Sequence, residues 1–261
     1  MPVLCPKVLP VLLAGVALLL GSCAVYAPTI PATPLLEKKQ VEVVASLRSL
    51  VAFDGSVAWA PTTHLLVVGE AAALQNNGSY SDQSVDLTYT DYHRQGGLGL
   101  GYYQAPTATR PAYWAAVGGV GFASTSLHAV DVGPPGFLFI PATEYRGHYQ
   151  AQYRRYYGQL YAAWPRPQGL TCGASLRGTV ADYTSLTLEG QPIAPVNRVF
   201  LEPTFFMRFG QRALRGQVTA GLSLPLSDDR NNPTAKRTAP LSYLFSIGLV
   251  IRPDLLLKKQ P

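Results

Sequence analysis

Apolar and polar residues alternate along most of the chain after residue 40, which is the period of a β-strand with one apolar face. In 241–252, for example, Tyr243, Phe245 and Ile247 alternate with serine and glycine. A helix would not give this period, so we expect an all-β fold. The pattern, diluted by glycine in two places, predicts ten strands at 40–49, 53–60, 65–75, 95–104, 112–123, 148–164, 169–183, 198–209, 214–226 and 241–252.

The connections between these strands alternate in length. The short ones are 61–64, 105–112, 165–168 and 210–213, and the long ones are 76–94, 124–147, 184–197 and 227–240. Outer-membrane barrels have short periplasmic turns and longer external loops, whereas a soluble sandwich has no reason to sort its loops. We therefore predict an antiparallel, up-and-down transmembrane β-barrel of about ten strands over 40–252, with a C-terminal tail at 253–261. One external connection, near residues 50–53, is short.

Aromatic and charged residues also divide between the two ends of this barrel. The places where strands meet short turns hold Trp59, Tyr102, Tyr103, Tyr113, Trp114 and Trp164, as expected of an interfacial aromatic girdle. Basic residues lie at the same end, at Lys38, Lys39, Arg110, Arg166, Arg212, Lys258 and Lys259. The first long loop instead carries Asp82, Asp86 and Asp91.

The composition fits a membrane barrel better than a nucleic-acid-binding protein. Charged residues make up 14% of the chain, against about 25% in soluble domains. No stretch after the N-terminal leader approaches the roughly 18 unbroken apolar residues of a spanning helix. The net charge is +6, but its basic residues form no cluster with interleaved aromatics on a helix. We therefore expect membrane lipid, and no nucleic acid, as a partner.

The N-terminus carries a secretory signal. Residues 1–22 combine a basic Lys7 with an apolar run at 8–20, and Leu20-Gly21-Ser22-Cys23 resembles the lipobox of bacterial lipoproteins. That resemblance implies cleavage before Cys23, acylation of its thiol and amino group, and a location in the outer membrane of a Gram-negative bacterium. An ordinary signal peptide with a chance cysteine is the alternative. Residues 23–39 hold several prolines, so we expect an extended tether there.

Three patches are similar to an uncharacterised family of outer-membrane β-barrel lipoproteins of Gram-negative bacteria. They are the N-terminal residues Cys23, Tyr26, Pro28, Pro34, Leu35 and Leu36, the stretch 58–65 and the stretch 99–103. The resemblance implies a lipid-anchored barrel and brings no activity. Many outer-membrane barrels end on an aromatic residue, whereas this chain ends at Pro261.

Little in the sequence indicates catalysis. The glycine runs at 96–101 and 118–121 lead into strands, whereas a phosphate loop needs a following helix. The four histidines lack the spacing of a metal pair, so we expect no metal and no cofactor. Asp91, His93 and Ser126 could meet at the external rim, which leaves a membrane-embedded hydrolase as an alternative.

The predicted lumen carries the most distinctive side chains. A polar cluster is expected from Tyr149, Tyr153, Arg155, Tyr157, Tyr161, Glu202, Arg208 and Arg215. A ten-stranded barrel is only slightly wider than the eight-stranded type that side chains fill. We therefore expect a bonded polar plug and a non-enzymatic structural or surface-interaction role. A small-solute channel, a lumenal ligand carrier and a lipid-tethered periplasmic β domain stay open as alternatives.

Overall fold

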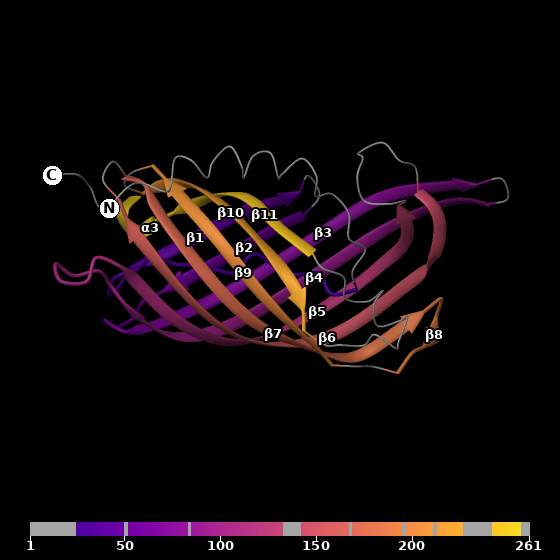
Figure 1. Ribbon diagram of the computed structural model, residues 1–261, viewed down its shortest axis with the longest axis horizontal. Coiled ribbons are helices and arrows are strands. Elements are labelled where there is room, and N and C mark those ends of the chain that lie inside the picture. The colour runs from indigo at the N-terminus through magenta and orange to yellow at the C-terminus, as the bar shows by residue number, and fades with distance from the viewer. Residues whose placement is uncertain are drawn as a thin grey trace.

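Ten long antiparallel strands form a closed barrel (Figure 1). The computed structural model describes residues 25–49, 52–82, 85–132, 142–166, 169–194, 197–210, 213–226 and 242–256. The strands are β1 (Val41–Ser49), β2 (Ala52–Trp59), β3 (Leu65–Asp82), β4 (Val85–Gln104), β5 (Tyr113–Val132), β6 (Ala142–Pro165), β7 (Thr171–Leu188), β9 (Arg198–Phe209), β10 (Leu214–Pro225) and β11 (Ser242–Ile251). A two-residue strand, β8 (Gln191–Pro192), and a short helix, α3 (Pro253–Leu256), complete the elements.

The topology is up-and-down, as the sequence predicted. Each long strand pairs antiparallel with the next, and β1 pairs with β11 to join the two ends of the chain, for example at Ala45↔Leu249. No long strand is left as an edge, so the backbone groups of the barrel bond to each other. The predicted strand 198–209 coincides with β9. The other predicted strands begin within six residues of the observed ones, except 95–104, because β4 already begins at Val85.

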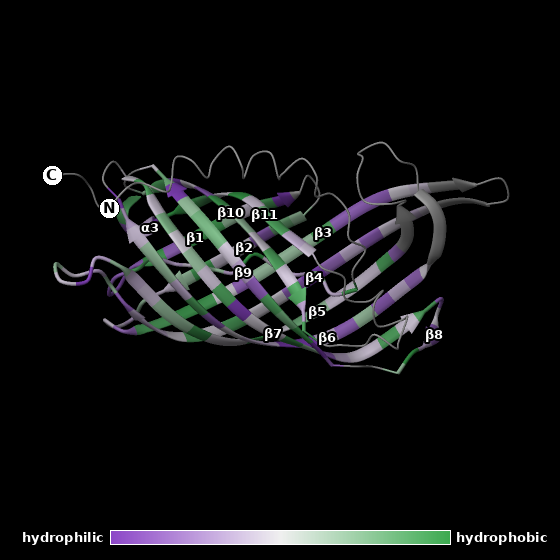
Figure 2. Cartoon of the chain, in the orientation of Figure 1, coloured by the Kyte–Doolittle hydropathy of each residue, from purple (hydrophilic) through white to green (hydrophobic). Residues whose placement is uncertain are grey.

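The outer face of the barrel is apolar. Large side chains near mid-strand point away from the barrel, with Leu98 68% exposed, Phe122 67% and Phe205 67%. On β11, Ile247 is 57% exposed while its neighbour Ser246 is buried, which confirms the predicted sides of this strand. Figure 2 shows hydrophobic bands along the strands of the wall. A soluble protein would bury such a surface, whereas lipid covers it in a membrane barrel.

The predicted aromatic girdle is correct in four of its six members. Trp59, Tyr102, Trp114 and Trp164 are exposed on the outer face near the short turns. The other two, Tyr103 and Tyr113, are buried inside the barrel, where their rings stack with centroids 5.7 Å apart. The error has a simple cause, since Tyr102 and Tyr103 are consecutive and so point to opposite faces.

Two of the predicted long loops, 76–94 and 124–147, are largely strand, and a third, 184–197, is half strand. The segments 76–94, 124–147 and 184–197 contribute residues to β3–β4, β5–β6 and β7–β8. A membrane strand needs only about 9–11 residues, but β3 to β7 have 18 to 24. In a membrane, their ladders would therefore continue beyond the hydrocarbon core into water, where polar side chains replace the apolar pattern. The fourth segment, 227–240, lies outside the described residues.

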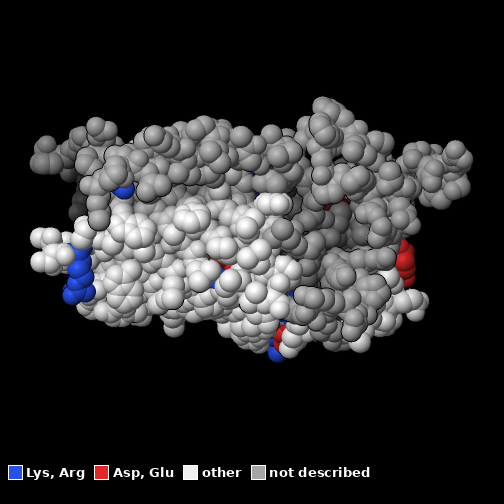
Figure 3. Space-filling model, viewed as in Figure 1, with Lys and Arg blue, Asp and Glu red and all other residues white. Residues whose placement is uncertain are grey.

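The resulting barrel has one raised side, made by β3 to β7 (Figure 1). We call this the extension; on the other side β1, β2, β9, β10 and β11 have only 8 to 12 residues. The end with the short turns carries basic side chains, and acidic ones lie at the end with the extension (Figure 3). Among the described residues, no helix is long and apolar enough to cross a membrane. The predicted signal peptide and Cys23 lie outside the described residues.

Candidate functional site

The barrel interior holds three arginines with no exposed surface. Arg155, Arg177 and Arg208 occupy inward positions on β6, β7 and β9. Alternation along each strand sends these side chains inward, while leucine and phenylalanine side chains point outward. A guanidinium that is removed from water must be paired, because an isolated buried charge costs many kcal/mol. The partners of these arginines therefore decide what the interior can do.

Glu70 on β3 pairs with two of them. Its Oε2 accepts a hydrogen bond from Arg155 Nη2 at 2.8 Å, and both of its oxygens accept from Arg177. Both guanidinium groups also contact the Tyr157 ring, with their carbons 5.0 and 4.4 Å from the ring centroid. Gln159 Oε1 accepts from Arg177 Nη2 at 2.7 Å. These contacts join the walls of β3, β6 and β7 across the lumen.

Two further glutamates, Glu42 and Glu202, are buried in the interior. Glu42 accepts two hydrogen bonds from Arg208, each 3.0 Å long. Glu202 accepts from Thr179 Oγ1 at 2.9 Å and from Ser223 Oγ at 3.2 Å. Two carboxylates, Glu70 and Glu42, thus pair with the three buried guanidinium groups, and hydroxyl groups hold the third carboxylate, Glu202. Groups so firmly bonded to each other are a structural core rather than a binding surface.

The chain's own N-terminal residues fill the remaining space. Residues 25–36, which we call the threaded segment, lie inside the barrel, and all but Ala27 and Leu35 are buried. Arg155 Nη1 donates to Thr29 Oγ1 at 2.6 Å, Gln159 Nε2 to the carbonyl of Ala32 at 2.7 Å, and Tyr161 Oη to the carbonyl of Pro34 at 2.7 Å. The sequence predicted extended chain here and gave no sign of its place in the lumen.

Glycines make room for the largest inward rings. A side-chain carbon added at Gly99 or Gly119 would collide with Tyr157. The glycine runs of β4 and β5 therefore serve close packing, as expected for glycine inside barrel strands. They leave room for the Tyr157 ring, which also contacts Arg155 and Arg177.

The structure places seven residues of the predicted lumenal cluster in the buried interior, and Arg215 is inward but half-buried. Arg155 and Tyr157 belong to the Glu70 network, while Tyr149 and Tyr153 pack with Tyr26 near the extension. The sequence prediction missed Glu70, Glu42 and Arg177. A signal for them was available in the sequence. In strands where apolar and polar residues alternate, a charged residue at a polar position lies on the lumenal side, as these three do on β3, β1 and β7.

Little empty space is left between the described residues of the interior. A cavity of about 20 Å³ lies between the threaded segment and the wall, lined in part by Ile30, Ser46 and Asp54. That volume is enough for about one water molecule. Arg48 Nε lies 3.5 Å from Asp54 Oδ2 beside it.

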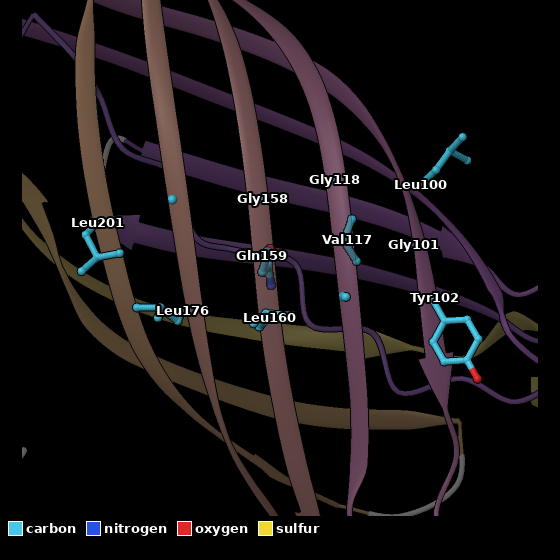
Figure 4. Close-up of a pocket in the computed structure, with 12 residues that line it drawn as sticks. Leu100, Gly101, Tyr102, Val117, Gly118, Gly158, Gln159, Leu160, Leu176 and Leu201 are labelled. Carbon is cyan, nitrogen blue, oxygen red and sulfur yellow. The ribbon is translucent and has the colours of Figure 1, made fainter.

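The larger hollow, about 620 Å³, lies on the outer face (Figure 4). Gly118, Gly158 and Gly178 stand in register on β5, β6 and β7, and Leu100, Leu160, Leu176 and Leu201 lie around them. The floor of glycines and the leucine walls make a shallow apolar groove. Lipid acyl chains would lie against it in a membrane.

A histidine cluster lies on the extension. Ser126 Oγ and His148 Nε2 are 2.6 Å apart, and the His148 ring stacks on His128 at 4.1 Å. Asp91 Oδ1 is 2.8 Å from His128 Nδ1. Burial, with a smaller effect from His128, lowers the pKa of His148, so this imidazole is neutral at pH 7.

The predicted trio of Asp91, His93 and Ser126 does not assemble. His93 Nδ1 instead contacts Thr125 Oγ1 at 2.7 Å, because it points inward while Ser126 is on the other face of its strand. Ser126 is only 3% exposed, so a substrate would not reach its hydroxyl. Among the described residues, no group of three or more His, Cys, Asp or Glu side chains could hold a metal ion.

Neither a protein-family model nor a curated protein matches this chain. The closed ten-stranded antiparallel barrel with an apolar outer face is of the outer-membrane type.

Proposed function

We propose that this protein is a lipid-anchored outer-membrane barrel with a sealed lumen and a non-enzymatic structural or surface-interaction role. One observation carries the proposal: the lumen is occupied by the threaded segment and by the buried Arg–Glu pairs. A barrel that is filled in this way offers a partner only its ends. The extension, made of β3 to β7, is then the surface through which it acts.

The filled lumen argues against the channel and carrier alternatives. A solute would have to displace residues 25–36 and separate Arg208 from Glu42, both of which are buried. Removing one member of such a pair costs about 3–5 kcal/mol. A passive channel has no source for this free energy.

Conductance across a planar bilayer tests the proposal. The purified full-length barrel, inserted at increasing amounts, should give no discrete current steps, while a porin measured in the same bilayers should give them. Reproducible steps that scale with the amount of inserted protein would contradict the sealed lumen.

The lipid anchor is tested separately. The Cys23→Ala variant should lose the fatty-acid label of cells grown with labelled palmitate, since only the cysteine thiol can form the thioether. The barrel itself should stay embedded, because its apolar wall holds it in the membrane. Wild-type labelling of this variant would contradict acylation at Cys23. The Cys172→Ala variant is the matched control and should label normally.

The hydrogen bond between Ser126 and His148 favours hydrolysis as a second candidate. A neutral histidine that accepts a hydrogen bond from serine is the activating half of a nucleophilic site. Against it stands the burial of Ser126. A fluorophosphonate probe should therefore leave the folded barrel unlabelled, with Ser126→Ala as the control. Labelling that Ser126→Ala abolishes would support the hydrolase instead.

A further inference from the structure

The threaded segment has a definite direction. Its contacts with β6 advance in step, from Tyr26 beside Tyr153, through Thr29 on Arg155 and Ala32 on Gln159, to Pro34 on Tyr161. β6 runs from the extension to a short turn, so the segment runs the same way.

The two ends of the segment confirm this direction. Val25 and Tyr26 pack in a cluster with Tyr149, Tyr183 and Leu186, all near the extension. Leu36 packs with Ala60, Leu66 and Tyr113, which lie beside the short turns. The chain then turns, with Lys39 donating its N–H to the carbonyl of Ala60, and enters β1.

The length of the segment matches the thickness of a membrane. Eleven steps of extended chain, from residue 25 to residue 36, span about 34 Å at 3.1 Å per residue. The hydrocarbon core of a bilayer is about 30 Å thick. The N-terminal chain therefore crosses the whole membrane inside the barrel.

The end near Tyr26 lies beside the low side of the barrel. The Tyr26 ring stacks on Phe200 at 3.9 Å, and Phe200 is the third residue of β9. Val25 follows Cys23 by two residue steps, which is a reach of at most about 7 Å.

From these observations, and resting on the lipid anchor proposed above, we propose that the acylated Cys23 lies at the end of the barrel that carries the extension. If the short turns face the periplasm, this is the cell surface, and the acyl chains enter the outer leaflet. The chain threads its own lumen and so reaches the leaflet opposite the short turns. The acyl chains of Cys23 and the extension then lie at the same end of the barrel.

Three insertions of one short polar epitope test this placement. The first lies between Ala24 and Val25, the second between Asp82 and Val85 at the tip of the β3–β4 hairpin, and the third within 107–109 between β4 and β5. The tip is used because residues further along the hairpin, such as Asn77 and Gly78, are paired inside the ladder. Each variant is labelled with palmitate and probed with antibody on intact and permeabilised cells.

We expect the first and second epitopes to bind antibody on intact cells, and the third to bind only after permeabilisation. If the first epitope behaves like the third while the second is on the surface, the placement of Cys23 is overturned and the barrel stands. If the first and second are both hidden and the third is on the surface, the placement holds but the orientation of the barrel is wrong. Absence of the palmitate label on the wild-type protein would overturn the lipid anchor.

Photo-crosslinking in the purified full-length barrel gives a second measurement without an insertion. A benzoylphenylalanine at Ala27 should crosslink to β6 or β7 near residues 149–153 or 181–186. One at Leu35 should crosslink near residues 58–66 or 103–113. The reverse assignment, or crosslinks from Ala27 to the short-turn end, would overturn the direction of the segment.

Discussion

At the scale of single residues, the interior depends on groups that have two partners each. Glu70 is bonded to Arg155 and Arg177, and it also accepts the N–H of Ala32 in the threaded segment at 3.2 Å. A carboxylate in that position holds three parts of the chain together. Arg155 and Arg177 are fully buried. Loss of Glu70 would therefore leave two unpaired charges in a low-dielectric interior.

The Glu70→Gln variant should therefore lower the free energy of unfolding by about 3–5 kcal/mol, the cost of breaking a buried pair from one side. Denaturant unfolding of the barrel in detergent, followed by tryptophan fluorescence, measures it. Glu37→Gln is the matched control, since Glu37 is exposed in the turn before β1 and its loss should change the free energy by less than about 0.5 kcal/mol. Equal effects of the two variants would contradict the network.

Two glycines, Gly119 and Gly158, should differ in how well they tolerate a methyl group. Gly119→Ala drives a methyl group into the Tyr157 ring and should cost about 1–3 kcal/mol, as overpacking does. Gly158→Ala adds its methyl group to open space on the outer face and should be nearly neutral. The same unfolding measurement compares them. A tolerated Gly119→Ala would show that Tyr157 does not pack against β5.

At the scale of elements, each strand has a lipid side and a lumen side, and its length sets its depth. On β11, Ile247 lies near the middle and Tyr243 near one end, and both are exposed. A charge on the lipid side costs more the deeper it lies in the bilayer. The short strands of the low side should therefore show a steep dependence on position.

Ile247→Arg should destabilise the folded barrel in lipid vesicles by roughly 2–4 kcal/mol, and Tyr243→Arg by roughly 0–1 kcal/mol beyond the lost packing. Reversible folding into vesicles measures both. Similar costs at the two positions would be inconsistent with a membrane midplane near Ile247.

The extension makes a pH-dependent element. Burial and His128 lower the pKa of His148, although Glu189 and Asp91 act in the other direction. As the pH falls, His148 therefore binds a proton in the unfolded chain at a higher pH than in the folded chain. The stabilisation that this contact gives to the fold is fully present above about pH 6.5 and is lost progressively below that value. An NMR titration of the His148 ring should give a midpoint below 6.5. A midpoint at or above 6.5 would contradict the buried stack.

At the scale of the whole molecule, alternation predicted the ten strands because successive residues of a barrel strand face the outside and the interior in turn. It could not predict where strands end in water, since Asn77 and Thr90 pair in a polar ladder that has no apolar side. It also missed the threaded segment. Proline-rich chain has the same local pattern outside a barrel as inside one, and only contacts such as Tyr161 to Pro34 reveal its place.

The central claim is that lipid covers the outer face and the chain itself fills the inner one. Accessibility of two neighbouring cysteines, Ile247→Cys and Ser246→Cys in a Cys172→Ala background, tests both halves in vesicles. We predict that a lipid-soluble maleimide labels position 247, that a charged aqueous thiosulfonate labels neither, and that position 246 reacts with both only after unfolding. Aqueous labelling at 246 in the folded barrel, or a position 247 shielded from the lipid-soluble reagent, would contradict the account.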